Sequence, residues 1–311
     1  MRDDPTRMGT WTAGDIGDLG GRIAVVTGAN SGLGLVTARE LARAGATVVP
    51  TAREPGKLAA ARGTILAHAP DAELDPRILD LASLDSVRSF ATAVAADHPR
   101  VDVLVNNAGV MMPPRSETAD GYELQFGTNH LGHFALTGLL LDALAAGDSS
   151  RVVTVSSLEH RPGRLDFDDL QSERSYAPRG AYQQSKFANA VFGLELDRRL
   201  RAAGLPVASV LAHPGYSATN LQVTGPTGVM KAVLAVSNRV FAQSAERGAL
   251  PQLYAATAPD VEGGQFYGPD GFQQARGAPT VVQPVGRARD EETARRLWEI
   301  SEELTGVSYL D

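Results

Sequence analysis

Short apolar segments alternate with amphipathic helical patterns along most of the chain. The apolar segments are residues 23–27, 47–51, 77–81, 101–105, 151–155 and 207–212, and helical patterns occupy residues 32–44, 55–68, 84–97, 120–145 and 181–203. Because strands that are apolar along their whole length are buried on both faces, this order predicts a parallel sheet with helices on both sides. No repeat of fixed period and no Pro/Ser-rich linker interrupts the pattern. We therefore expect one α/β domain over residues 21–311, after an N-terminal tail (residues 1–20).

The composition narrows the class of protein further. The chain has no cysteine, which rules out disulfides, thiolate zinc sites, iron–sulfur clusters and a cysteine nucleophile. Asp and Glu outnumber Lys and Arg by 36 to 29, so neither a nucleic acid nor an anionic membrane is the expected partner. No apolar run of about 18 residues is present, and the first residues lack the apolar stretch of a secretory signal. We expect a soluble, cytoplasmic protein without a metal site.

The first predicted strand leads into a glycine-rich turn that opens the first helix. The glycines are Gly28, Gly32 and Gly34. Gly28 permits a tight turn, and the other two let the backbone approach a pyrophosphate and let the helix pack on the strand. Amides at the start of the helix would then face phosphate oxygens. This placement predicts a dinucleotide site that also includes Asn30, Ser31 and Leu33; a turn that only starts a helix is the alternative.

Three further motifs follow the glycine turn in an order typical of one family. After TGANSGLG (27–34) come NNAG (106–109), YQQSK (182–186) and PGYSAT (214–219). Together they resemble the short-chain dehydrogenase/reductase superfamily over residues 21–270, and NHLGHF (129–134) and VSSLEH (155–160) are most similar to its retinol dehydrogenase-like group. The resemblance implies a single Rossmann-type, doubly wound sheet of about seven strands. It also implies cofactor contacts from Asn107, Ala108, Gly109, Tyr182, Lys186, Pro214, Gly215 and Thr219.

The segment after the second strand bears on which nicotinamide cofactor is bound. An acid there would accept hydrogen bonds from the adenosine ribose and repel a 2′-phosphate, as in NAD enzymes. Arg53 stands there instead, and its planar cation suits phosphate, so we expect NADP(H) in preference to NAD(H). Glu54 beside it leaves open that Arg53 is an ordinary solvated residue. Asp80 and Leu81 resemble the family's adenine-contacting pair, although Asp80 could instead cap the next helix.

Tyr182 and Lys186 are the expected proton-exchanging pair. They lie four residues apart at the start of a predicted helix, so their side chains share one face. A tyrosine with its ordinary pKa of about 10 exchanges protons poorly near neutrality. An ammonium at about 4 Å, with an effective dielectric constant of 20, favours the phenolate by roughly 4 kcal/mol. That energy corresponds to about three pKa units, which would bring the pKa of Tyr182 toward neutrality.

A serine and an asparagine complete the expected catalytic set. Ser157 follows the fifth strand, where a hydroxyl can stabilise a developing alkoxide; the resemblance places the catalytic serine here and turns Ser156 inward. By the same resemblance, Asn129 holds a water in the proton relay to Lys186, and a buried asparagine paired with backbone is the alternative. Tyr176 competes with Tyr182, but no cation stands four residues after it.

Two histidines in the fourth helical pattern could be mistaken for metal ligands. His130 and His133 are three residues apart. With no cysteine in the chain and no carboxylate pattern near them, packing and hydrogen bonding account for them better than a metal site does.

The resemblance implies an NADP(H)-dependent oxidoreductase that interconverts a carbonyl and an alcohol by hydride transfer. Tyr182 would exchange the proton, Ser157 would polarise the oxygen, and Lys186 would hold the nicotinamide ribose. Residues 158–180 and 216–247 are expected to form substrate loops. The apolar segment 226–241 favours a small lipophilic substrate, or is an ordinary helix covering the core. A catalytically silent NADP(H)-binding sensor or scaffold, and a C=C reductase, are the alternatives.

The resemblance also bears on assembly. Members of the family often pair through the helices after strands four and five, which is compatible with a homodimer or homotetramer here. The helical pattern at residues 291–304 would then cap either its own sheet or a neighbouring subunit.

Overall fold

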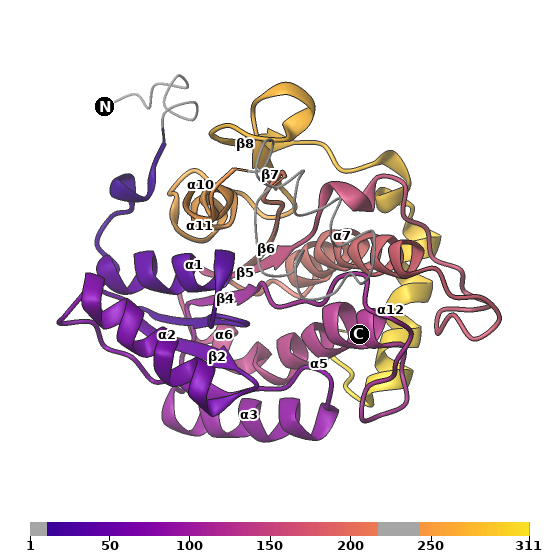
Figure 1. Cartoon of the computed structure of the whole chain (residues 1–311), viewed down its shortest axis with the longest axis horizontal. Coiled ribbons are helices and arrows are strands. Elements are labelled where there is room, and N and C mark those ends of the chain that lie inside the picture. Colours follow the sequence, from indigo (N-terminus) through magenta and orange to yellow (C-terminus); the bar gives the residue numbers. More distant parts are fainter. Residues whose placement is uncertain (1–10, 217–242, 311) are drawn as a thin grey trace.

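The computed structural model describes residues 11–216 and 243–310. An eight-stranded sheet in the order β3-β2-β1-β4-β5-β6-β7-β8 forms the middle layer (Figure 1). Strands β1 to β7 run parallel, and β8 pairs antiparallel with β7. The order reverses between β1 and β4, which confirms the doubly wound fold. The strands are β1 Ile23–Val26, β2 Thr47–Ala52, β3 Arg77–Ile78, β4 Val103–Asn106, β5 Ser150–Val155, β6 Val207–Ala212, β7 Phe266–Pro269 and β8 Pro279–Val282.

Helices cover both faces of this sheet, as the apolar strands predict (Figure 1). Alternate residues of each strand enter different cores because successive strand side chains point to opposite faces. Val25 and Leu104 lie in the core beneath α3, α5, α7 and α12, whereas Val26 and Val105 lie in the core beneath α1 and α11. The helices on the two faces are α1 Gly32–Arg43, α2 Pro55–His68, α10 Ala245–Gly248 and α11 Leu250–Thr257, and α3 Leu84–Asp97, α5 Gly132–Leu139, α7 Pro178–Ala202 and α12 Glu291–Thr305.

The prediction of one continuous helix over residues 120–145 is wrong in two respects: the helix starts later, and it is interrupted. It begins at α4 (Leu124–Phe126), where the Glu123 carboxylate accepts hydrogen bonds from the amides of Gln125 and Phe126 at 3.0 and 2.7 Å. A π-helical turn, η3 (Gly127–Leu131), follows, and α5 and α6 (Leu141–Ala145) complete the segment. Residues 127–130 (GTNH) carry no apolar side chain, so the helical periodicity has a gap here that does not by itself identify a π turn.

The C-terminal helix α12 packs on helices of its own chain. Trp298 is buried, with its ring centroid 5.0 Å from that of Phe134 on α5 and 4.8 Å from that of Tyr309. The Arg199 guanidinium of α7 lies 4.4 Å from the centroid of the Trp298 ring. Helix α12 therefore covers α5 and α7 within the same chain. These are the two helices through which subunits of the family often pair.

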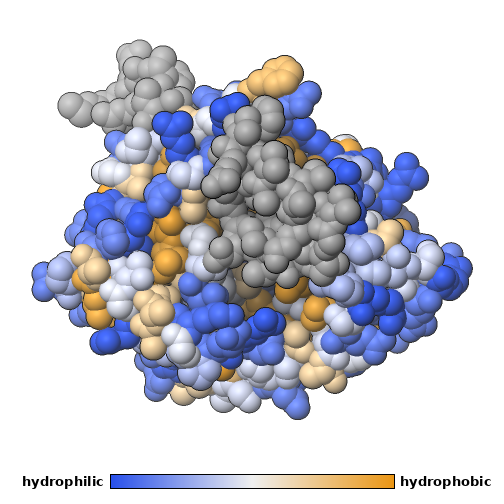
Figure 2. Space-filling view, in the orientation of Figure 1, coloured by the Kyte–Doolittle hydropathy of each residue, from blue (hydrophilic) through white to orange (hydrophobic). Residues whose placement is uncertain are grey.

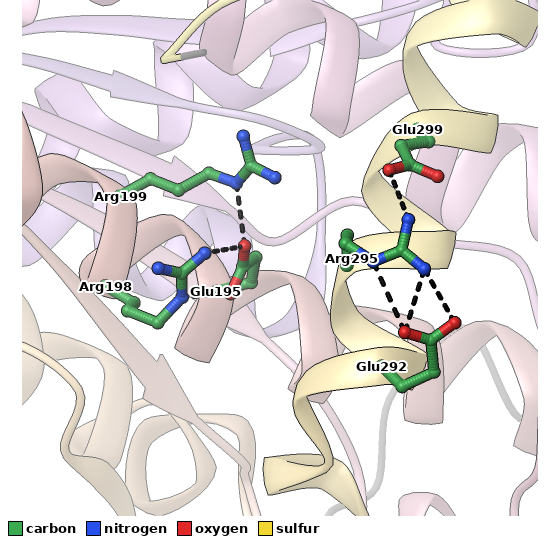
Figure 3. Close-up of polar contacts among 6 residues, drawn as sticks. All are labelled: Glu195, Arg198, Arg199, Glu292, Arg295 and Glu299. Carbon is green, nitrogen blue, oxygen red and sulfur yellow. Dashed lines mark hydrogen bonds and ion pairs between the residues drawn. The ribbon is translucent and has the colours of Figure 1, made fainter.

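Helices α7 and α12 each carry ion pairs between their own side chains. Figure 3 shows two groups, one on α7 and one on α12. On α7, the buried Glu195 carboxylate accepts hydrogen bonds from Arg198 and Arg199 at 2.6 and 2.7 Å. Burial alone would raise the pKa of Glu195, but these two guanidinium groups lower it below its ordinary value. On α12, Arg295 bridges Glu292 and Glu299.

Residues 11–19 of the predicted tail lie against the body of the protein. The Trp11 ring meets Tyr254 of α11 edge-on at 5.1 Å. The Leu19 amide donates to the carbonyl of Ala44 at 2.8 Å, and Leu19 is buried. This part of the tail is therefore a strap over the α1–α11 face.

The surface is hydrophilic over most of the face in Figure 2, with apolar residues gathered left of centre, where Figure 1 places α1. Large apolar side chains exposed among the described residues are Ile78, Phe272 and Val281. Two of the three belong to the β7–β8 hairpin. Within residues 11–216 and 243–310, none of the helices has both the length and the apolarity that crossing a bilayer requires.

Candidate active site

The predicted motifs meet at the carboxyl ends of the central strands. The glycine turn follows β1, the NNAG segment follows β4, Ser157 follows β5, and Pro214 and Gly215 follow β6. Parallel strands bring these ends to one edge of the sheet, beside the point where the strand order reverses. Thr219 and most of the expected loop 216–247 lie outside the described residues.

The glycine turn has a conformation and a packing that require glycine. Gly28 and Gly32 have φ angles of +65° and +54°, which favour residues without a side chain. A Cβ on Gly34 would overlap the carbonyl oxygen of Gly28 and lie 2.5 Å from Nδ2 of Asn107. Ser31 is the N-cap of α1 but makes no side-chain cap bond. The first amides of α1 have no acceptor within the helix, so the turn fits a pyrophosphate.

A buried threonine joins the glycine turn to the NNAG segment. Oγ1 of Thr27 accepts hydrogen bonds from the amides of Asn107 and Ala108, both at 2.9 Å. Nδ2 of Asn107 donates in return to the Thr27 carbonyl at 2.8 Å. Nε2 of His133 lies 3.0 Å from Oγ1 of Thr27, and Nδ1 of His133 lies 2.9 Å from the Asn129 carbonyl oxygen. A carbonyl only accepts, so the His133 ring proton lies on Nδ1, and the single hydroxyl proton of Thr27 is shared between Nε2 of His133 and the Val105 carbonyl, 3.2 Å away.

This role of His133 escapes sequence reasoning because its partner Thr27 is 106 residues away. Burial lowers the pKa of His133 to about 4 and that of His130 to about 3, and both rings are neutral at ordinary pH. His130 instead hydrogen-bonds Oγ of Ser301 at 2.9 Å. No group of three or more His, Cys, Asp or Glu that could hold a metal occurs in the part of the chain that the structure describes.

Asn129 lies in the π turn and is fully buried. Its side chain accepts from the Val110 amide at 2.8 Å and donates to the Val110 carbonyl at 3.0 Å and to Oγ of Ser185 at 2.9 Å. The side chain is thus paired with backbone. A Cβ on Gly109 would lie 3.0 Å from Oδ1 of Asn129 and 3.7 Å from Nζ of Lys186, so Asn129 and Lys186 flank the same short stretch of backbone. Its role in a water relay stays a prediction.

Ser157, Tyr182 and Lys186 come together after β5. Oγ of Ser156 points inward and donates to the Lys186 carbonyl at 2.8 Å, as expected. Oγ of Ser157 accepts from the Glu159 amide at 3.2 Å, and Ser157 lies near enough to Tyr182 to lower the pKa of its hydroxyl. Nζ of Lys186 donates to the Val155 carbonyl at 3.1 Å and lies 5.9 Å from the centroid of the Tyr182 ring.

The expected shift of the Tyr182 pKa toward neutrality is wrong for the chain alone. The pKa of Tyr182 is raised to about 12: burial is the largest cause, the nearby Ser157 hydroxyl opposes it, and the charge of Glu159 adds to it. Burial also lowers the pKa of Lys186 to about 8. Both side chains are almost fully buried, and desolvation disfavours both the Tyr182 phenolate and the Lys186 ammonium.

The residues expected near the adenosine half differ in exposure. Arg53 is exposed, and its Nε lies 3.7 Å from the carboxylate of Glu54. Asp80 accepts from the Ala82 amide at 3.0 Å and does not cap α3, because Ser83 is the N-cap of that helix. Leu81 is buried.

The hydrogen bonds of Tyr176 and of the Pro214–Gly215 turn are defined in the structure. The Tyr176 hydroxyl donates to the Pro113 carbonyl at 2.7 Å and accepts from Gln125 at 3.1 Å, which ties it to the loop rather than to Lys186. Gly215 has a φ of +65°, and its amide donates to Nδ1 of His213 at 3.1 Å. The Pro214 carbonyl accepts from Gln243 at 2.7 Å.

A doubly wound sheet with a glycine turn at its switch point, and a serine, tyrosine and lysine at the next strand end, defines a dinucleotide-binding α/β enzyme. The chain belongs to the short chain dehydrogenase family, whose model matches residues 22–227. It is therefore an oxidoreductase.

Relatives and solved structures agree with this assignment. Retinol dehydrogenase 13 of Homo sapiens is 44% identical, over 92% of this chain and 85% of the relative. Polyprenol dehydrogenase of Mus musculus is also 44% identical, over 92% and 84%. The crystal structure of an uncharacterized protein from Mycobacterium paratuberculosis has a TM-score of 0.81 at 46% identity, covering 96% of this chain and 98% of that one. A short chain dehydrogenase from Shigella flexneri complexed with NADP has a TM-score of 0.64 at 25% identity, covering 80% and 96%.

Proposed function

We propose that the protein is an NADP(H)-dependent oxidoreductase that interconverts a carbonyl and an alcohol on a small lipophilic substrate. The observation that carries this proposal is the buried Tyr182 side chain, which lies near Ser157 and has Nζ of Lys186 5.9 Å from its ring centroid, at the edge of the sheet where the glycine turn lies. A hydroxyl donor pair of this kind suits proton transfer to a carbonyl oxygen.

The residues around the glycine turn would hold the dinucleotide. The first amides of α1 would bind the pyrophosphate, and Asn107, Ala108 and Gly109 would lie along the path toward Lys186. When bound, the nicotinamide supplies or accepts the hydride.

The protein's own side chains carry the proton. Ser157 accepts a hydrogen bond from the Glu159 amide, and with substrate bound its hydroxyl proton would turn to the carbonyl oxygen and orient it. Tyr182 then donates its phenolic proton to that oxygen in reduction and takes it back in oxidation. Lys186 offsets the negative charge that remains on Tyr182. Burial of Tyr182 and Lys186 strengthens these interactions.

The names of two relatives support a lipophilic substrate, since retinol and polyprenols are long apolar alcohols. The test is a panel of carbonyl compounds with NADPH, following loss of the nicotinamide absorbance. The panel pairs retinal and a polyprenyl aldehyde with short, polar aldehydes. We expect turnover of the long apolar members. Turnover confined to the polar members would contradict the substrate class, and a blank panel in protein that binds NADPH would contradict the reaction.

Arg53 gives a prediction for cofactor choice. We expect NADPH to bind more tightly than NADH, because the exposed Arg53 guanidinium would meet the 2′-phosphate that only NADPH carries. One charge-assisted hydrogen bond contributes about 1.5 kcal/mol, so Arg53→Ala should reduce the preference about tenfold. The measurement is a titration that follows nicotinamide fluorescence.

Arg62→Ala is the matched control for this titration, since Arg62 is another exposed arginine, further along α2. It should leave the preference unchanged. Equal binding of both dinucleotides by the wild type, or an equal effect of both substitutions, would refute the role of Arg53.

A further inference from the structure

The loop between β7 and β8 is held in an unfavourable backbone conformation. Gln273 and Gln274 have φ angles of +52° and +59°, and consecutive non-glycine residues in the left-handed region carry a conformational cost. Burial of apolar surface does not offset it, because the adjoining Phe272 is 86% exposed. Such strain persists only where other contacts hold it in place.

The contacts that hold the loop come from both sides of the candidate active site. Oε1 of Gln274 accepts a hydrogen bond from Arg161 at 2.5 Å, and Arg161 ends the short turn that starts at Ser157. The same oxygen lies 3.1 Å from Nε2 of His213. His213 directly precedes the Pro214–Gly215 turn.

The hydrogen bond from His213 has a fixed direction. The Gly215 amide donates to Nδ1 of His213, so the ring proton lies on Nε2 and is donated to Gln274. His213 is buried, and burial lowers its pKa to about 3, which keeps this neutral form over the working range of pH.

The loop backbone makes a second contact with the same turn. The Ala275 carbonyl accepts from the Tyr216 amide at 2.7 Å. A Cβ on Gly215 would overlap that carbonyl oxygen, so Gly215 packs directly on the loop. The loop itself is closed by hydrogen bonds from the Gly271 amide to the Arg276 carbonyl and from the Gln274 amide to the Gly271 carbonyl, at 3.0 and 2.8 Å.

The geometry points to Gln274 as a positioning residue that couples the Ser157 turn to the Pro214–Gly215 turn. Its side chain hydrogen-bonds Arg161 and His213, and it acts through these two residues. This inference rests on the proposed function, because that function assigns Ser157 to the substrate oxygen and Pro214–Gly215 to the dinucleotide. In this role, Gln274 keeps the Ser157 turn and the Pro214–Gly215 turn at a constant separation.

Hydrogen–deuterium exchange in the chain without added ligand tests the coupling independently of activity. Gln274→Met keeps the length of the side chain but removes the shared acceptor. We expect faster exchange at the amides of residues 158–161 and 215–216. Gln274→Glu keeps an acceptor oxygen and should restore the wild-type pattern. Gln273→Met is the matched control, because Gln273 has the same backbone strain but an exposed side chain without a hydrogen-bond partner among the described residues.

Kinetics then test whether the coupling serves the reaction. In Gln274→Met we expect kcat to fall about tenfold with the substrate KM changed less than about twofold, because misplacing Ser157 weakens the transition state more than the ground state. Equal exchange in Gln274→Met and Gln273→Met, or a change in only one of the two turns, would overturn the coupling. Altered exchange with unchanged kcat would overturn the positioning role. A wild type that binds neither dinucleotide would instead refute the proposed function, while the exchange data would still decide the coupling.

Discussion

Tyr182→Phe is expected to lower kcat about 10²–10⁴-fold, the range that a positioned acid or base contributes. The ring is buried and phenylalanine fills the same volume, so the fold and the dinucleotide site should survive. Only the proton that passes between the hydroxyl and the substrate oxygen is lost. The measurement is NADPH turnover with a carbonyl found in the panel, together with a nicotinamide fluorescence titration that should match the wild type.

Tyr176→Phe is the matched control for this substitution. It removes the hydrogen bonds to Pro113 and Gln125, so it should cost about 1 kcal/mol of stability and leave kcat almost unchanged. If Tyr182→Phe kept full activity, the catalytic role would be wrong. If the wild type bound NADPH but turned over no substrate, a silent dinucleotide-binding sensor would be favoured.

The pH dependence of alcohol oxidation provides a related test. Oxidation requires the Tyr182 phenolate as base, and burial raises the pKa of Tyr182 to about 12. The fraction of phenolate therefore increases as the pH rises from neutrality toward that value, and the oxidation rate should rise with it. In Tyr182→Phe this rise should vanish. A rate that peaks near neutrality in the wild type would show that the tyrosine titrates much lower than its burial indicates.

Gly34→Ala should abolish dinucleotide binding and destabilise the fold. The added methyl group would overlap the Gly28 carbonyl and lie 2.5 Å from Nδ2 of Asn107. Overpacking of this kind costs about 1–3 kcal/mol, and relief would require the turn to move away from the NNAG segment. Denaturant unfolding and the fluorescence titration measure the two effects.

Gly63→Ala is the control for Gly34→Ala: it adds the same methyl group, but it should raise stability and leave dinucleotide binding unchanged. Gly63 lies inside α2, and a Cβ there would meet no atom within 4 Å. Replacing a helix-interior glycine by alanine stabilises by about 0.5–1 kcal/mol. If both variants bound NADPH as the wild type does, the close contact at Gly34 would not be needed for the site.

The central strands and most helices follow from the sequence because their apolar patterns are local. The predicted segments 207–212, 55–68 and 84–97 match β6, α2 and α3 residue for residue. The antiparallel β8 was not predicted, since its four residues carry little pattern of their own. The π turn was not predicted, because the polar residues 127–130 only leave a gap in the apolar periodicity.

The candidate site also has features that the sequence predicts and features that it does not. Motif spacing places Tyr182 beside Lys186 and brings the glycine turn to the NNAG segment. Spacing does not reveal burial, so the direction of the Tyr182 pKa shift could not be predicted. The contacts of Thr27 with His133 and of Gln274 with Arg161 join residues 106 and 113 positions apart, and no local pattern marks them.

The packing of α12 has a consequence for the order in which the protein can fold during synthesis. Trp298 and Tyr309 complete the aromatic layer over Phe134 and Phe192, and both are translated after every helix that they cover. Until residue 309 has left the ribosome, the apolar faces of α5 and α7 stand open to solvent or to a chaperone. The dinucleotide edge of the sheet is assembled from earlier residues, so a nascent chain could hold its cofactor turn before its opposite face is sealed.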